Sequence, residues 1–224
     1  MFILVRTDLE APKHEGISFL LLPMDQPGIE VRPIKLISGN SPFNQIFLTN
    51  ALAARDDLVG TLNRGWTIGK RLLQHERSGM DQLVRGGTSS GTSDLATVAK
   101  NYIGEVDGKI ADSSMRDSVL NHDMTLRSLN LTKRRVMEES SDGSTPGPAT
   151  SIFKVMTTDL EKVHYDLSTS LKGSQGFGWD GDAFSSSELE DLRLLLSSRA
   201  ASIYSGSNEI QRNIIAKRVL GLPD

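Results

Sequence analysis

Glu76, followed directly by Arg77, is the first residue placed to do chemistry. From Gly65 onward apolar residues recur at helical spacing, and on a helical projection Glu76 falls inside the apolar arc, between Leu83 and Gly69. Burial disfavours the charged form of a carboxylate and raises its pKa, which suits a general base working near neutrality. The alternative is a structural ion pair between Glu76 and an arginine from a neighbouring helix.

A second candidate lies near the end of the chain, where a turn rich in glycine and serine, residues 203–207, runs into a helix. Asn208 is predicted to be the N-cap, and Gln211, three positions later, completes the spacing of a capping box. The free N–H groups and the positive end of the helix dipole at such a place hold an anion or a ligand carbonyl. The alternative is that Asn208 serves only as a cap, because every helix needs one.

The third candidate is the stretch from Gly173 to Gly181, which has four glycines in nine residues. Glycines let a backbone approach a phosphate closely. A helix rather than a strand is predicted to precede this loop, so it does not match a dinucleotide-binding fingerprint. The alternative is an ordinary loop between two helices.

Composition narrows the classes of protein that remain. The chain has 25 Lys and Arg against 28 Asp and Glu, a net charge of -3, whereas a nucleic-acid-binding protein normally shows a basic excess. It has no cysteine, which excludes disulfides and thiolate chemistry and suits a reducing compartment, the bacterial cytoplasm or a mitochondrial matrix. No run of about 18 apolar residues occurs, so we expect no membrane span. The histidines show no metal-ligand spacing, and no G-x-S-x-G motif supports a hydrolase.

The elements that position these residues change character along the chain. Up to about residue 60, short apolar runs punctuated by glycine and proline predict an antiparallel sheet or barrel. The runs are too few to close a barrel, so we expect only part of one. The predicted strands cover residues 1–6, 17–22, 29–37 and 43–48.

From Gly65 onward the apolar periodicity is helical. Ser185 and Glu188 have the spacing of a capping box, which predicts the start of a helix. Gly221 and Pro223 are typical of a helix end. The predicted helices cover residues 65–84, 93–104, 113–140, 149–171, 185–203 and 208–220.

Several segments, in the same order, resemble the acyl-CoA dehydrogenase family. Residues 16–34 are similar to the later strands of its β-domain. Residues 58–77, which include Asn63-Arg64-Gly65-Trp66 and Glu76-Arg77, resemble the start of its C-terminal helical domain. The ending from Asn208 to Pro223 is very similar to the closing helix of the family. The resemblance touches both ends of the chain, so it is more specific than one short motif.

The resemblance implies a fold of three domains: an N-terminal helical domain, a β-barrel and a C-terminal four-helix bundle. We therefore expect an α+β fold that is mostly α, with the C-terminal part of an antiparallel β-barrel over residues 1–62. An acyl-CoA dehydrogenase-type helical bundle is expected over residues 63–224. The chain opens directly on the apolar strand Met1–Val5, which suggests that the N-terminal domain and the first barrel strands lie outside this sequence.

The resemblance also implies a cofactor and partners. Family members bind FAD, remove the α-proton of an acyl-CoA thioester with a glutamate, and pass the β-hydride to flavin N5. Their electrons then go to an electron-transfer flavoprotein. Gly173, Ser174 and Gly176 resemble a glycine-rich loop near the FAD of the partner subunit. The residues expected to lie near the flavin and its adenosine half are Ser205, Ser207, Asn208 and Glu209.

Two departures from the family bear on catalysis. Many members carry the base just after the tyrosine of the closing turn, where this chain has Ser205, and a serine hydroxyl is too weak a base for that proton. A smaller branch carries a glutamate on the first helix of the bundle, and Glu76 matches that position, with Arg77 beside it to orient it. Residues 86–93 lack the Arg-x-x-Phe-Gly segment that reaches the flavin of a neighbouring subunit. This resembles members assembled from unlike subunits, some of which handle bulky or sterol-side-chain acyl groups.

Three functions stay open from the sequence. The first is an active acyl-CoA dehydrogenase with Glu76 as its base. The second is a catalytically inactive or partner subunit of a heteromeric acyl-CoA dehydrogenase, and the third is a helical scaffold fragment without a cofactor. An exposed sheet edge and the helical bundle predict a homo- or hetero-oligomer in each case.

Overall fold

A computed structural model describes residues 1–72, 94–139 and 150–223. Contacts divide the chain into two compact units. The sheet unit comprises Met1–Lys35 and Ser41–Gly87, and the helical unit comprises Leu36–Asn40 and Thr88–Asp224. The fold is α+β and mostly helical, as predicted.

The sheet unit holds two antiparallel sheets. In the first, β1 (Phe2–Arg6), β2 (Ile17–Leu21) and β5 (Leu58–Val59) lie in the order β1-β2-β5. In the second, β3 (Ile29–Ile34) pairs with β4 (Phe43–Leu48), with Val31 opposite Ile46. Within the described residues these strands do not close into a barrel, which agrees with the expectation of a partial one. The two-residue strand β5 was not predicted, because so short a run shows no alternation.

A close backbone approach sets the start of the first helix. The buried hydroxyl of Ser18 on β2 accepts a hydrogen bond from the Asn63 N–H at 2.8 Å, which ties the chain to the strand just before Gly65. A side chain at Gly65 would collide with the backbone of Ser18 and Phe19, so only glycine fits there. Residues 65–72 are helical from this point, as predicted.

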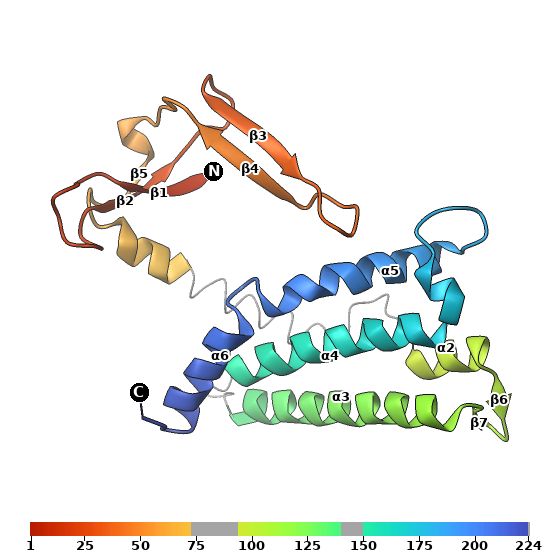
Figure 1. Ribbon diagram of the computed structural model, residues 1–224. Helices are drawn as coiled ribbons and strands as arrows, with labels where there is room; N and C mark the ends of the chain where they lie inside the picture. Colours follow the sequence, from red (N-terminus) through yellow and green to blue (C-terminus); the bar gives the residue numbers. More distant parts are fainter. Residues whose placement is uncertain (73–93, 140–149, 224) are drawn as a thin grey trace. The chain divides into compact units, whose positions relative to one another are not determined.

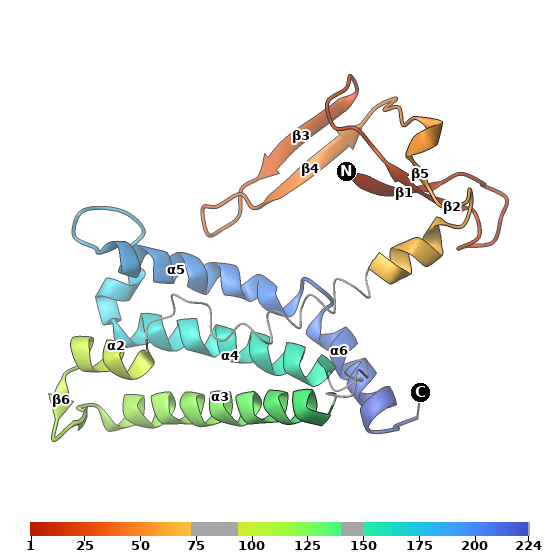
Figure 2. The same cartoon turned by 180° about the vertical axis from the view of Figure 1, so that it is seen from behind.

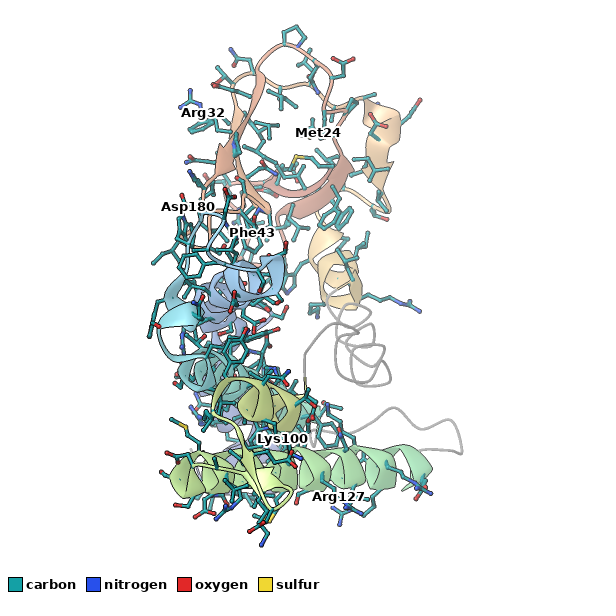
Figure 3. All side chains as sticks on the ribbon, turned by 90° about the vertical axis from the view of Figure 1, so that its right-hand side faces the viewer. Met24, Arg32, Phe43, Lys100, Arg127 and Asp180 are labelled. Carbon is teal, nitrogen blue, oxygen red and sulfur yellow. The ribbon has the colours of Figure 1, made fainter. Side chains whose placement is uncertain are left out.

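The helical unit is a layered bundle. Helix α4 lies between α3 and α5 in both views (Figure 1 and Figure 2). Arg127 on α3 is exposed and points out of the unit (Figure 3). The described α-helices are α2 (Leu95–Tyr102), α3 (Ser113–Glu139), α4 (Thr150–Leu171), α5 (Ser186–Ser198) and α6 (Asn208–Ile214).

Two groups of buried apolar side chains hold the bundle together. One joins α2, α3 and the end of α4, and the other joins the middle of α3 to the first half of α4. Burial of such side chains contributes roughly 1.5–3 kcal/mol each. The first group consists of Leu95, Val98, Ala99, Ile110, Val119 and Leu171, and the second of Leu129, Phe153 and Leu160.

The helix starts follow side-chain caps. Asp94 accepts a hydrogen bond from the Thr97 N–H at 3.0 Å and begins α2. The predicted capping box of Ser185 and Glu188 is confirmed at the start of α5. A short hairpin between α2 and α3, β6 (Glu105–Val106) and β7 (Lys109–Ile110), was not predicted.

Two predicted helices end earlier than expected. Helix α5 stops at Ser198 and continues as the 3-10 helix η3 (Arg199–Ser202). Helix α6 stops at Ile214 and continues as the π-helix η4 (Ile215–Val219). Apolar spacing does not distinguish these tighter or wider turns from an α-helix, so the sequence predicted one continuous helix in each place.

Candidate functional site

Glu76 and Arg77 lie outside the described residues, in the range 73–93. The structure therefore reports nothing about the proposed base or about the arginine beside it. The helical segment over residues 65–72 leads toward them, in agreement with the predicted helix. The assignment of Glu76 as the base stays a prediction.

The segment between α5 and α6, residues 199–207, is called the closing turn here. It begins with η3 and then exposes two large side chains, Ile203 at 69% and Tyr204 at 49%. Ser205 and Gly206 both have a positive φ, 54° and 90°. The φ of Gly206 lies where side chains are strained, so this bend favours glycine.

The prediction that Asn208 caps α6 is wrong. Ser207 has the extended backbone of an N-cap, with φ −63° and ψ 154°, and its hydroxyl accepts a hydrogen bond from the Ile210 N–H. The Asn208 side chain instead points into the bundle and is only 2% exposed. Because serine and asparagine are both good caps, sequence spacing did not separate the two neighbours.

The buried amide of Asn208 joins α6 to α4. Its Oδ1 accepts hydrogen bonds from Lys154 Nζ and from the Thr158 hydroxyl, each at 3.2 Å. Its Nδ2 lies 3.1 Å from Thr158 Oγ1 and donates to Asp159 Oδ1 at 3.3 Å. The side chain is therefore fully occupied inside the protein.

Lys154 completes this polar cluster and was missed by sequence reasoning. It is 6% exposed, and its Nζ donates to the Ala201 carbonyl at 2.6 Å. Burial, and then the positive charge of Lys162, lower the pKa of Lys154. Lys154 and Thr158 are one turn apart on α4. A polar pair at this spacing, on a face that also carries Phe153, was the sequence signal that could have identified this cluster.

The glycine-rich segment forms the short 3-10 helix η2 (Gly173–Phe177) directly after α4. Gly173 has a φ of +55° and open space around its Cα, and Ser174 is exposed. Gly176 is buried, and a Cβ atom there would collide with the Thr169 carbonyl. Glycine is thus needed at Gly173 for its backbone angle and at Gly176 for its packing.

A polar cluster ties α2, α4 and α5 together beside this segment. Lys172 forms an ion pair with Asp191, which also accepts a hydrogen bond from the Ser168 hydroxyl at 2.6 Å. The Tyr102 hydroxyl donates to Glu188 at 2.7 Å. Burial, followed by the Glu188 carboxylate, raises the pKa of Tyr102 to about 12. The Tyr102 hydroxyl, followed by the Ser185 N–H, lowers the pKa of Glu188.

Within one chain, the closing turn and the glycine-rich segment lie far apart in space. Lys154 and Thr158 hold the closing turn near the start of α4, whereas Gly173 follows its last turn. The rise of an α-helix, about 1.5 Å per residue, puts Lys154 and Thr158 roughly 20–30 Å from Gly173. The structure therefore brings Ser205, Ser207 and Glu209 together, but it does not bring Gly173 and Ser174 to them.

Two further observations concern the described residues alone. No helix among them is long and apolar enough to cross a membrane. In the same ranges, no group of three or more His, Asp or Glu side chains is arranged to hold a metal ion.

Solved structures share this fold. The "Tcur3481-Tcur3483 steroid ACAD" structure aligns with a TM-score of 0.78 at 22% identity, over 99% of this chain and 56% of that chain. The ChsE4-ChsE5 complex from Mycobacterium tuberculosis aligns with a TM-score of 0.75 at 21% identity, over 100% of this chain and 57% of that chain.

Sequence relatives give the family. The chain is 33% identical over 224 residues to acyl-CoA dehydrogenase IpdE1 of Mycolicibacterium smegmatis, covering 99% of this chain and 53% of the relative. It is also 33% identical to acyl-CoA dehydrogenase IpdE1 of Mycobacterium tuberculosis, covering 99% of this chain and 55% of that protein. The chain thus spans about half the length of the curated relatives it matches. The family model "Acyl-CoA dehydrogenase, C-terminal domain" matches residues 63–220. The chain belongs to the acyl-CoA dehydrogenase family.

Proposed function

We propose that this chain is the C-terminal part of an FAD-dependent acyl-CoA dehydrogenase, which oxidises the Cα–Cβ bond of an acyl-CoA thioester. The observation that carries the proposal is the 33% identity to an acyl-CoA dehydrogenase over 99% of this chain. Residues 1–62 would complete the β-domain and residues 63–224 would form the helical domain. Electrons would leave through an electron-transfer flavoprotein.

The closing turn has donor and acceptor groups that fit FAD, a cofactor rich in phosphate and hydroxyl groups. Ser205 is exposed at the bend, and the Ser207 hydroxyl, whose oxygen caps α6, lies beside the Glu209 carboxylate. The pKa of Glu209 is lowered, first by the backbone N–H of Glu209 itself and then by the Ser207 hydroxyl. The Glu209 carboxylate therefore accepts hydrogen bonds at neutral pH. The Asn208 side chain is occupied inside the bundle, so we assign its role to holding the turn.

The glycine-rich segment fits the same cofactor in a different way. Nothing lies within 4 Å of the place where a Cβ atom of Gly173 would stand, so a ligand has access to the backbone there. Ser174 adds an exposed hydroxyl. Gly176 supports the segment from beneath by packing on α4. Because this segment is distant from the closing turn, we propose that it serves the FAD of a partner subunit.

FAD, when bound, would accept the β-hydride at its N5 position. The part of this chain would be to remove the α-proton, and Glu76 is the group we propose for that step, with Arg77 orienting it. Ser205 stands in the closing turn, and its hydroxyl does not ionise near neutral pH. Burial of Glu76 on the apolar arc of its helix would raise its pKa toward the value that a general base needs.

A second function is favoured by a specific observation. Two of the structural neighbours carry paired names, Tcur3481-Tcur3483 and ChsE4-ChsE5, and the second is titled a complex. With Ser205 in the closing turn, this chain could instead be a non-catalytic partner in a heteromeric acyl-CoA dehydrogenase. A cofactor-free scaffold is the third candidate, and the visible absorption of bound flavin in the purified protein would contradict it.

The test of the base is Glu76→Gln in the flavin-loaded enzyme, with dehydrogenation followed by reduction of an artificial electron acceptor. We expect kcat to fall by about 10²-fold or more, the range typical for loss of a general base. Glu105→Gln is the matched control, because Glu105 is exposed and forms a surface ion pair with Lys100, and this variant should keep full activity. Undiminished turnover in Glu76→Gln would show that the base lies elsewhere.

A further inference from the structure

One ammonium group contacts both sides of the closing turn. Lys154 Nζ donates to the carbonyl of Ala201, just before the exposed residues, and to Oδ1 of Asn208, just after them. Ala201 is fully buried and Asn208 nearly so. The six residues between them, 202–207, are thus held at both flanks by a single side chain from α4.

Burial of the Lys154 ammonium group costs free energy, which indicates that this lysine has a specific role. Among the described residues no carboxylate is close enough to Lys154 to form a direct ion pair, although the group is buried; Asp159, Glu161 and Glu209 act on its charge from further away and raise its pKa in part. A buried charge without a counter-ion is unfavourable unless hydrogen bonds compensate it. A second buried lysine, Lys172, which directly follows α4, has the usual solution, an ion pair with Asp191. At Lys154 the compensation comes from the two flanks of the turn.

The turn has little else to fix its shape. Its large side chains, Ile203 and Tyr204, are exposed, and its bend needs positive φ angles at Ser205 and Gly206. The N–H groups of Ile203 and Tyr204 both bond back to the Ala200 carbonyl. Without the contacts of Lys154, the chain between η3 and α6 would have few restraints.

We propose that Lys154 is a positioning residue, whose ammonium group fixes the closing turn in the shape that presents Ser205 and Ser207 to the flavin. The flavin half of this proposal rests on the function proposed above. The turn-holding half rests on the contacts of Lys154 alone. Lys154 does not touch the cofactor or the substrate in this proposal; it acts through the backbone of Ala201 and the side chain of Asn208.

Amide hydrogen exchange in the full chain tests the first half. Lys154→Met keeps the apolar stem and removes the ammonium, and we expect exchange across residues 202–211 to accelerate at least about tenfold, as for a locally opened segment. Lys172→Met is the matched control, since it removes the buried lysine that directly follows α4. It should accelerate exchange near residues 173–185 and leave the closing turn unchanged. Equal acceleration of the closing turn in both variants, or none in Lys154→Met, would overturn the proposal.

A milder variant keeps the test decisive if Lys154→Met does not fold. Thr158→Val retains the ammonium and its bond to Ala201 but removes one hydroxyl partner of Asn208. We expect a smaller acceleration, confined to residues 207–211. An unchanged exchange pattern there would contradict the role of the Asn208 flank.

Flavin affinity, measured by titration of the apoprotein with FAD, tests the second half. Lys154→Met should weaken FAD binding by roughly tenfold, the size typical of a lost supporting contact. Wild-type affinity combined with an accelerated turn would overturn the flavin half and leave the turn-holding half standing. A wild-type chain that binds no FAD, with its closing turn still protected by Lys154, would instead contradict the proposed function.

Discussion

Lys154 on α4 and Lys172 directly after α4 are both buried and are compensated in different ways. Lys172 forms an ion pair with Asp191, and its ammonium lies 5.9 Å from the centre of the Tyr102 ring. Lys154 depends on a carbonyl and an amide oxygen. Removing one member of a buried charged pair lowers stability more than replacing both members, because the remaining charge is left unpaired. The groups that contact each lysine are therefore hard to replace. At the residue scale, these two side chains determine how the exposed segments are supported.

Glu188 offers a prediction with a definite pH dependence. Its pKa is lowered in the folded state, first by the Tyr102 hydroxyl and then by the Ser185 N–H. A lowered pKa contributes stability above the ordinary glutamate value, about 4.3, and that contribution is lost as the pH falls through the folded-state pKa. We expect Glu188→Gln to destabilise the protein by about 1–3 kcal/mol at pH 7, because glutamine keeps one acceptor oxygen for two donors, the Tyr102 hydroxyl and the Ser185 N–H.

Urea unfolding of wild type and Glu188→Gln at pH 7 and near pH 4 measures this dependence. The difference between the two proteins should begin to shrink near pH 4, because the glutamate of the unfolded state takes up its proton first, and it should vanish only below the folded-state pKa. Glu138→Gln is the control, because Glu138 is exposed and pairs with Arg134 on the surface; such pairs contribute little. A gap that stays constant with pH would contradict the role of the carboxylate charge.

At the element scale, η2 depends on the close approach of Gly176 to the last turns of α4. Gly176→Ala would force the new methyl group against the Thr169 carbonyl, and overpacking of this kind costs about 1–3 kcal/mol. We expect a lower midpoint of thermal unfolding and weaker binding of FAD. Ser174→Ala, at an exposed position of the same turn, should leave the midpoint unchanged. Equal stability of Gly176→Ala and wild type would show that η2 shifts without cost.

The elements show how far the sequence alone could lead. Strand β4 and helices α3 and α4 were predicted to within about a residue, because their apolar periodicity is long and their ends carry turn residues. The ends of α5 and α6 were not, since 3-10 and π turns keep nearly the same spacing. The exchange of roles between Ser207 and Asn208 depends on Lys154, which is distant in sequence. A contact over that separation leaves no local signal.

At the scale of the whole molecule, the position of α4 decides how a cofactor could be shared. The closing turn contacts its first half and the glycine-rich segment follows its end, roughly 20–30 Å away at about 1.5 Å per residue. On the proposed function, the two segments of one chain therefore serve different flavins, or distant parts of one. A site completed by a second chain binds its ligand only when the chains associate, so apparent affinity depends on protein concentration.

We therefore expect FAD to be lost from the protein on dilution, together with dissociation of the oligomer. Ultrafiltration across a dilution series would measure free flavin, and sedimentation velocity would follow the oligomeric state in the same samples. Ser174→Glu, which places a negative charge on the exposed glycine-rich segment, should weaken retention of the anionic cofactor by like-charge repulsion without changing the sedimentation profile. Glu138→Gln on α3 should change neither measurement. Flavin that stays bound to a dissociated chain would show that one copy supplies the whole site.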